Sequence, residues 1–173
     1  MLQKVSILAL CKFMTVSETV CTQNLQLVFD LLSSETCPTD VKKNIIVAMG
    51  DFLKRYTNLM TDQRIRLFDI LSDKETSVRK CALLVLAQQI LGDMLKLDGE
   101  IVDICLLLTD DSAEIRTLAE SLLQALHKKD AKFTFSKFLQ AFNRLSTKFA
   151  WIKREDFCEV AQKLMRNIVG DKH

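Results

Sequence analysis

Three segments of the chain repeat one pattern at an interval of 37 residues. Each opens a strongly apolar helical stretch, and the segments are Val41-Lys42-Lys43, Val78-Arg79-Lys80 and Ile115-Arg116-Thr117. In the last two, an aspartate (Asp73, Asp110) stands five residues before the first apolar residue. A fixed period of about 20–50 residues with helical patterning is typical of a stacked solenoid, which works through extended surfaces instead of one buried cleft.

The composition favours long helices. Hydrophobic residues make up 49% of the 173 residues, with only four Gly and one Pro, so turn-rich all-β folds are disfavoured. Charged residues interrupt each apolar stretch well before about 20 residues, and we therefore expect no membrane span and no membrane partner. The six cysteines are scattered without a C-x-x-C motif, which favours reduced thiols and a cytosolic or nuclear protein.

Apolar spacing predicts an all-α fold, an α-solenoid of helix pairs stacked as a right-handed superhelix. The expected helices cover residues 2–14, 24–33, 38–56, 63–72, 77–95, 99–108, 112–128, 133–145 and 154–169. Residues 1–130 form the repeat segment, with units at about 2–33, 38–72, 76–108 and 112–128. Residues 131–173 form an atypical closing pair of the same solenoid, which gathers seven of the chain's twelve aromatic residues.

The repeated aspartates predict a structural ladder at the inter-helix turns. The carboxylates of Asp73 and Asp110 can cap the following helix or pair with an arginine, and Arg79 and Arg116 are the expected partners. Thr36 occupies the corresponding place in the preceding unit, so we expect the ladder to end or weaken there. Two helices per repeat, with Asp before and Val-Arg after the turn, resemble the HEAT repeat.

Two longer segments resemble one HEAT family in particular. Residues 44–59 (NIIVAMGDFLKRYTNL) and 78–101 (VRKCALLVLAQQILGDMLKLDGEI) are similar to the C-terminal HEAT region of the family of condensin complex subunit 1. The residues that carry this resemblance, and that do not repeat at 37, are Asn44, Gly50, Asp51, Asp93, Met94 and Gly99. The corresponding region of the condensin II HEAT subunit is related, and Asp93-Met94 with Lys96 and Gly99 favours subunit 1 over it.

The resemblance implies a non-catalytic scaffold in the nucleus and on chromosomes, with a cytoplasmic pool. Its partners would be the kleisin and SMC subunits of condensin, and chromosomal DNA contacted directly or through the complex, in support of mitotic chromosome condensation. The alternative from another class is a transport or scaffolding adaptor of the importin or adaptin type. Family members are far longer, so we expect a fragment or a reduced relative, with Leu8, Leu10 and Phe13 partly bare at the N-terminal end.

Gly50 stands inside a predicted helix, where glycine costs about 1 kcal/mol relative to alanine. A close helix crossing or a slight kink would explain it structurally. The functional interpretation is that the neighbouring Asp51 contacts a partner.

Catalytic and metal chemistry find little support in the sequence. The only histidines are His127 and His173, and no Cys, His or carboxylate set has metal-ligand spacing. Asp110-Asp111 lies at a repeat turn, where capping is the simpler explanation than acid–base catalysis. No glycine-rich phosphate loop is present. We therefore expect no enzyme activity, no cofactor and no small-molecule substrate.

Charge is unevenly distributed along the chain. Residues 1–127 carry 13 Lys and Arg against 17 Asp and Glu, whereas residues 128–173 carry 11 against 5. The basic end is a candidate DNA or partner surface through phosphate contacts, against the simpler interpretation of a solvated helical face. Its candidate residues are Lys128, Lys129, Lys132, Lys137, Arg144, Lys148, Lys153 and Arg154.

Overall fold

The computed structural model describes residues 2–130, 136–137, 158 and 162. The closing helix pair predicted at residues 131–173 therefore lies almost wholly outside the described residues. The chain divides into two compact units, Met1–Lys96 and Leu97–His173. Across the described residues every regular element is helical, so the predicted all-α helical-repeat fold is confirmed there. The right-handed superhelical sense stays a prediction.

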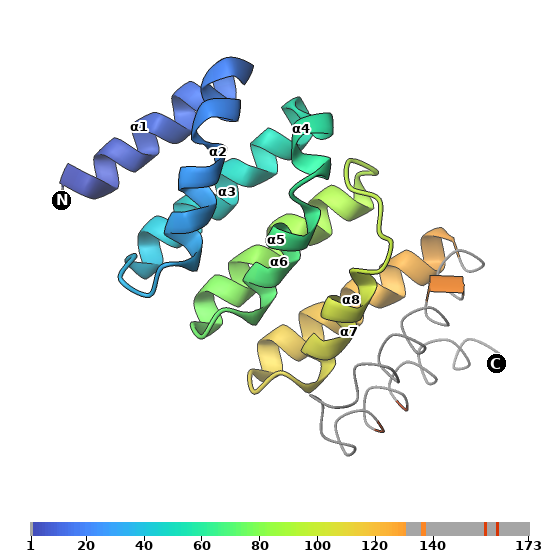
Figure 1. Ribbon diagram of the computed structural model, residues 1–173. Helices are drawn as coiled ribbons and strands as arrows, with labels where there is room; N and C mark the ends of the chain where they lie inside the picture. Colours follow the sequence, from blue (N-terminus) through green and yellow to red (C-terminus); the bar gives the residue numbers. More distant parts are fainter. Residues whose placement is uncertain (1, 131–135, 138–157, 159–161, 163–173) are drawn as a thin grey trace. The chain divides into compact units, whose positions relative to one another are not determined.

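The first unit is built from antiparallel helix pairs in two layers (Figure 1). The helices α1, α3 and α6 lie side by side in one layer, and α2 and the short segments α4, α5 and η1 cover them. The bounds are α1 Leu2–Val16, α2 Glu18–Ser33, α3 Thr39–Arg55, α4 Thr57–Thr61, α5 Arg64–Asp69, the 3-10 turn η1 Ile70–Ser72 and α6 Thr76–Leu91.

The second unit has the same arrangement, in which an outer segment (like α2 or α5) covers an inner helix (like α3 or α6). Its outer element is α7 (Ile101–Leu106) continued by the 3-10 turn η2 (Leu107–Thr109), and its inner helix is α8 (Ala113–Lys129). The outer elements of both units, α5–η1 and α7–η2, tighten into a 3-10 turn directly before the repeated aspartate. The two segments that match in sequence therefore also match in structure.

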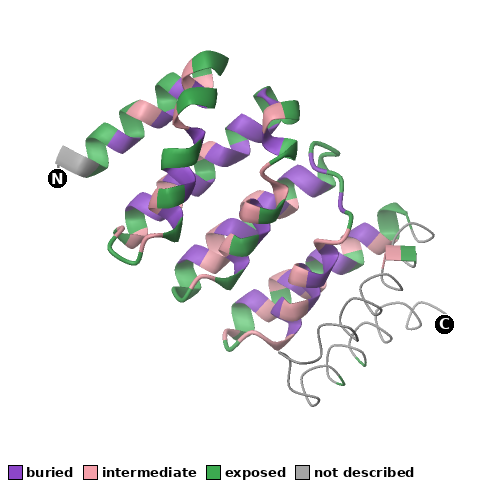
Figure 2. Cartoon of the chain, in the orientation of Figure 1, coloured by how far each residue is buried: buried purple, intermediate pink, exposed green. Residues whose placement is uncertain are grey.

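Buried residues, coloured purple in Figure 2, lie mainly where the helices face one another. In the first unit they include Phe29 of α2, Phe52 of α3 and Phe68 of α5. Leu86 and Leu123 lie 37 residues apart, one repeat interval, and they are 3% and 1% exposed. Burial of these apolar surfaces is the main stabilising term available to each unit.

The outward side of α1 is apolar and open. Phe13 and Val16 are 67% and 74% exposed, Val5 and Leu8 are exposed as well, and Leu10 is half-buried. The opposite side of the same helix, with Ile7, Cys11 and Met14, is buried. No helix among the described residues is both long and apolar enough to cross a membrane.

Two predicted helix ends were wrong. The helix expected to start at Asn24 begins at Glu18, because the Ser17 side chain accepts a hydrogen bond from Val20 N and caps it. The helix expected to run to about Leu95 ends at Leu91. There Asp93 takes the left-handed conformation (φ 61°), and Met94 N and Leu95 N both donate to the Gln89 carbonyl, which turns the chain.

Candidate interaction surface

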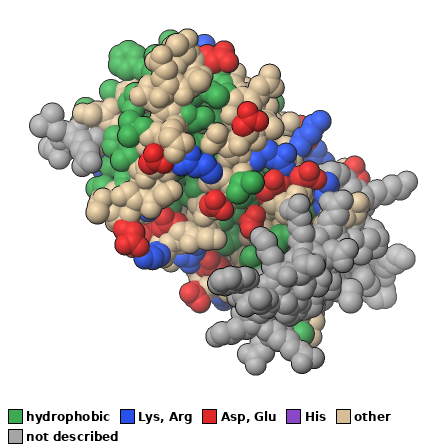
Figure 3. All heavy atoms as spheres, viewed as in Figure 1, with side chains coloured by type: hydrophobic (Ala, Val, Ile, Leu, Met, Phe, Trp, Pro, Cys, Tyr) green, Lys and Arg blue, Asp and Glu red, His purple; other side chains and the backbone are tan. Residues whose placement is uncertain are grey.

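A groove of about 490 Å³ opens on the first unit between the α2–α3 loop and the turn from η1 to α6. This volume is within the range of about 300–1,000 Å³ found for ligand clefts. Apolar and charged residues both contribute to it, and Figure 3 shows acidic and basic side chains interspersed on this face of the unit. Its lining residues are Phe29, Leu32, Ser33, Glu35, Cys37, Thr39, Lys42, Arg66, Asp69, Ile70, Ser72, Asp73, Lys74 and Glu75.

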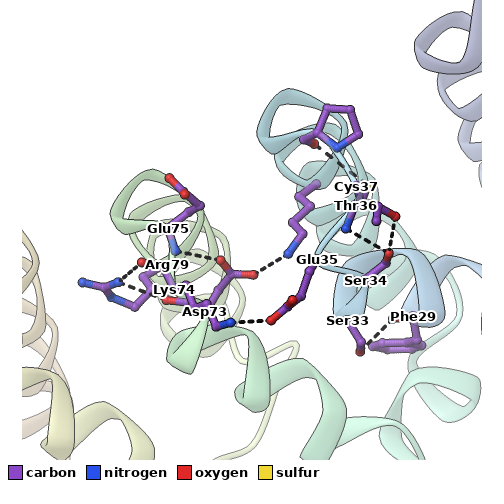
Figure 4. A network of polar contacts seen from close by, with 12 residues as sticks. Phe29, Ser33, Ser34, Glu35, Thr36, Cys37, Asp73, Lys74, Glu75 and Arg79 are labelled. Atoms are coloured by element: carbon purple, nitrogen blue, oxygen red, sulfur yellow. Dashed lines mark hydrogen bonds and ion pairs between the residues drawn. The ribbon is translucent and has the colours of Figure 1, made fainter.

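A buried ion pair fixes the inner wall of the groove. Lys42, in the first turns of α3, donates to Asp73 Oδ2 at 2.8 Å, and the two side chains are only 10% and 13% exposed. Asp73 Oδ1 accepts a second bond from Glu75 N at 2.9 Å, just before α6 begins. The pair therefore joins the start of one inner helix to the turn before the next (Figure 4).

A second ion pair crosses the mouth of the groove. Lys74 donates to the Glu35 carboxylate, and both side chains are largely exposed. The hydrogen bond from Lys74 lowers the pKa of the Glu35 carboxyl and raises the pKa of Lys74 itself. Exposed pairs of this kind contribute little to stability, so this contact can open at low cost.

Arg66 of α5 closes the far side of the groove. Its guanidinium donates to Gln26 Oε1 at 2.8 Å and to Asp30 Oδ1 at 3.0 Å, both on α2. It also stacks over the Phe29 ring, 4.4 Å from the centroid. Contacts spaced by 36 and 40 residues thus connect equivalent elements of successive repeats.

The repeated turns have closely similar hydrogen bonds. Asp110 Oδ1 accepts from Ser112 N at 2.8 Å, as Asp73 does from Glu75 N. Arg79 donates to the carbonyls of Asp73 and Lys74. Arg116 donates in the same way to the carbonyls of Asp110 and Asp111. Aspartate and arginine thus meet at each turn, with the arginine bound to backbone oxygens of its own turn.

The partner from a neighbouring repeat is a lysine. Lys42, and not an arginine, reaches the Asp73 carboxylate. In the preceding turn the Ser34 hydroxyl accepts from Thr36 N at 3.3 Å, so serine supplies a similar acceptor where aspartate is missing. Sequence reasoning missed Lys42, Glu35 and Lys74. The signal for them was charge of opposite sign spaced by 31 and 39 residues, close to the repeat period.

The residues that carry the family resemblance fall into two groups, one on α3 and one in the segment between α6 and α7. Gly50 lies where α3 crosses α6, and a Cβ built there would stand 2.9 Å from Val85 Cγ1. This supports the close-crossing explanation, since any larger residue requires a shift. Asp51 is exposed and Asn44 is half-buried on the same helix. Asp93 forms the left-handed turn after α6, followed by exposed Met94, and half-buried Gly99 precedes α7.

Few of the predicted basic-surface residues fall in the described part of the chain. Lys128 and Lys129 are exposed in the last turn of α8. The Lys137 side chain is 15% exposed and pairs with Asp98 at 2.5 Å. The others, Lys132, Arg144, Lys148, Lys153 and Arg154, lie outside the described residues.

Potential metal ligands and thiols can be assessed among the described residues. Within the described ranges, no three His, Cys, Asp or Glu side chains are grouped to hold a metal ion. Burial raises the pKa of the Cys11 and Cys21 thiols to about 11, so neither is activated as a thiolate near neutral pH. The Cys37 thiol in the groove also has a raised pKa, chiefly because of burial.

Comparison with known families decides which helical-repeat protein this is. The family model described as "non-SMC mitotic condensation complex subunit 1" (Cnd1) matches residues 40–173. This chain belongs to that family. The match includes Lys42, Asp73 and both repeated turns.

Named relatives in the condensin subunit 1 family match nearly the whole chain. Condensin-1 complex subunit CAP-D2 of Arabidopsis thaliana is 35% identical over 172 residues, or 99% of this chain. Condensin complex subunit 1 is 32% identical in Xenopus laevis over 97% of the chain, and 34% in Homo sapiens over 95%. The chain spans 12% of the length of each relative.

Proposed function

We propose that this chain is a non-catalytic HEAT-repeat scaffold of condensin that binds the kleisin subunit and supports mitotic chromosome condensation. The observation that carries the proposal is the condensin subunit 1 family match over residues 40–173, on a fold of stacked helix pairs. A solenoid of this kind offers a continuous outer surface to an extended partner chain. The groove between the α2–α3 loop and the η1–α6 turn is one part of such a surface.

The wider assignment follows from the same membership. The chain would act with the SMC subunits, in the nucleus and on chromosomes, with a cytoplasmic pool between divisions. It would use neither a cofactor nor a small-molecule substrate.

Mitotic behaviour tests this assignment in cells. We expect the tagged full chain to concentrate on chromosomes in mitosis, and the kleisin and both SMC subunits to be recovered with it from mitotic extract. An importin- or adaptin-like adaptor would instead stay on transport structures and recover cytoplasmic sorting partners. That second pattern would contradict the condensin assignment.

Direct DNA contact by the basic end is a second candidate. It is supported by the exposed Lys128 and Lys129 at the end of α8 and by the excess of basic residues beyond them. If it is correct, Lys128→Glu with Lys129→Glu and Lys132→Glu weakens retention on DNA and flattens its salt dependence. Retention that is unchanged in this variant would argue that the lysines form an ordinary solvated face.

A further inference from the structure

Two carboxylates of the groove remain uncompensated. Of the cations that line it, Lys42 pairs with Asp73, Lys74 pairs with Glu35, and Arg66 pairs with Asp30 outside the lining. Asp69 at the end of α5 and Glu75 before α6 are both exposed. Across the described residues, neither of these two carboxylates has an ion-pair or hydrogen-bond partner. The lining therefore holds four carboxylates against three cations.

Apolar atoms accompany these charges. Ile70 of η1 and Cys37 are half-buried and line the same groove, and Leu32 of α2, which is already buried in the core, lies behind them in the lining. A ligand that fits must therefore offer cationic groups beside aliphatic ones. A nucleic acid offers the wrong charge, since its phosphates would face Asp69 and Glu75.

We propose that this groove binds a short segment of a partner protein that carries lysine or arginine next to aliphatic side chains. The cations of the segment approach Asp69 and Glu75, and its aliphatic groups cover Ile70 and the apolar part of Cys37. The exposed Lys74–Glu35 pair at the mouth gives way or rearranges as the segment enters. The segment is defined by this chemistry, whether or not the kleisin supplies it.

Matched synthetic peptides test the charge and the aliphatic requirement separately. The probes are fluorescent peptides of sequence KLRLK, its aliphatic-free analogue KSRSK and its acidic analogue ELELE, titrated with the full chain and followed by anisotropy. We expect saturable binding of KLRLK, weaker binding of KSRSK and none of ELELE. Added salt should weaken the KLRLK complex, because the contacts are exposed ion pairs.

Substitution of the two free carboxylates locates the site. The variant Asp69→Asn with Glu75→Gln should bind KLRLK about fivefold to tenfold more weakly, as the loss of two exposed ion pairs would give. Asp62→Asn, which removes an exposed carboxylate away from the groove, should bind as the unchanged chain does. Circular dichroism should show equal helicity in all three proteins.

Several outcomes would overturn the proposal. One is that KLRLK shows no saturable binding to the unchanged chain up to about 1 mM. A second is that the Asp69→Asn, Glu75→Gln variant binds KLRLK as tightly as the unchanged chain does. A third is that KSRSK and KLRLK bind the unchanged chain equally well. Duplex DNA that binds the unchanged chain and loses that binding in the Asp69→Asn, Glu75→Gln variant would also overturn it. None of these results bears on kleisin recovery from mitotic extract, so failure here is distinguishable from failure of the condensin assignment.

Discussion

Lys42 and Asp73 show how a single pair of residues connects two repeats. Their side chains are nearly buried and their charged atoms are 2.8 Å apart. The desolvation of both charges offsets much of their attraction, so the pair adds little net stability relative to a neutral replacement. Removing one partner is different, because the other charge is then left uncompensated in a buried place.

A double-mutant cycle measures this asymmetry. Lys42→Met alone should lower the free energy of unfolding by about 3 kcal/mol, because the Asp73 carboxylate loses its counter-charge. Adding Asp73→Asn should recover most of the loss, since an amide oxygen can still accept from Glu75 N. Urea unfolding of the single and double variants measures both values. Additive losses would argue that the two side chains do not interact.

The crossing of α3 and α6 leaves no room for a side chain at Gly50. Gly50→Ala should destabilise the chain by about 1–3 kcal/mol, because the new Cβ would stand 2.9 Å from Val85 Cγ1. This is the net effect, because the steric penalty exceeds the gain of about 1 kcal/mol that alanine brings to a helix interior relative to glycine.

The control for Gly50 is the same substitution beside a smaller neighbour. In a Val85→Ala background, Gly50→Ala should cost much less or become favourable, as measured by thermal unfolding. If Gly50→Ala stabilises the unchanged chain, the close crossing is not what keeps glycine at this position.

At the level of the helix, the end of α6 depends on one backbone conformation. Asp93 has φ 61°, a region that glycine adopts without strain and most other residues do not. Asp93→Gly should therefore leave the free energy of unfolding unchanged or raise it slightly, whereas Asp93→Val should lower it by about 1–3 kcal/mol. Denaturant melts of the two variants check the order. Equal changes in the free energy of unfolding for the two variants would show that the left-handed conformation at residue 93 does not affect stability.

The inner helices are held by leucines at equivalent repeat positions. Leu86→Ala in α6 and Leu123→Ala in α8 should each cost about 2–5 kcal/mol, because both side chains are buried. Leu84, on the exposed side of the same helix, provides the matched control. Leu84→Ala should lower the free energy of unfolding by well under 1 kcal/mol. A loss below about 1 kcal/mol at Leu86 or Leu123 would contradict the packing register of that helix.

Periodicity made the helices predictable, and local turn chemistry limited their ends. The 37-residue interval was sufficient to predict the all-α repeat. It could not show that Ser17 starts α2 early or that Asp93 ends α6 before Leu95. Those ends depend on one side-chain cap and one backbone dihedral, which leave no periodic signal.

The groove was less predictable than the helices. Its ion pairs join side chains 31 and 39 residues apart, and only the stacking of repeats brings them together. The repeated Asp73 predicted this turn, with helix capping or an arginine partner as the alternatives. Its carboxylate accepts from Glu75 N just before α6 and also pairs with Lys42, which the sequence did not suggest. The buried lysine of the preceding repeat could be identified only once the helices were placed.

At the scale of the whole molecule, family membership predicts a scaffold, and two exposed surfaces are where binding to other chains can be tested. The chain corresponds to about an eighth of a condensin subunit 1 relative, given its 12% coverage. It has exposed apolar residues along α1 and a groove of mixed charge between α2 and α6. Both are features that a scaffold can use to bind other chains.

Direct binding to the kleisin subunit of the same species is the measurement that tests the central claim. The purified full chain and purified kleisin are mixed and followed by analytical ultracentrifugation, with the Leu84→Ala variant as a folded control. A scaffold of condensin predicts a complex that sediments faster than either protein. Kleisin and chain that sediment independently would contradict the account.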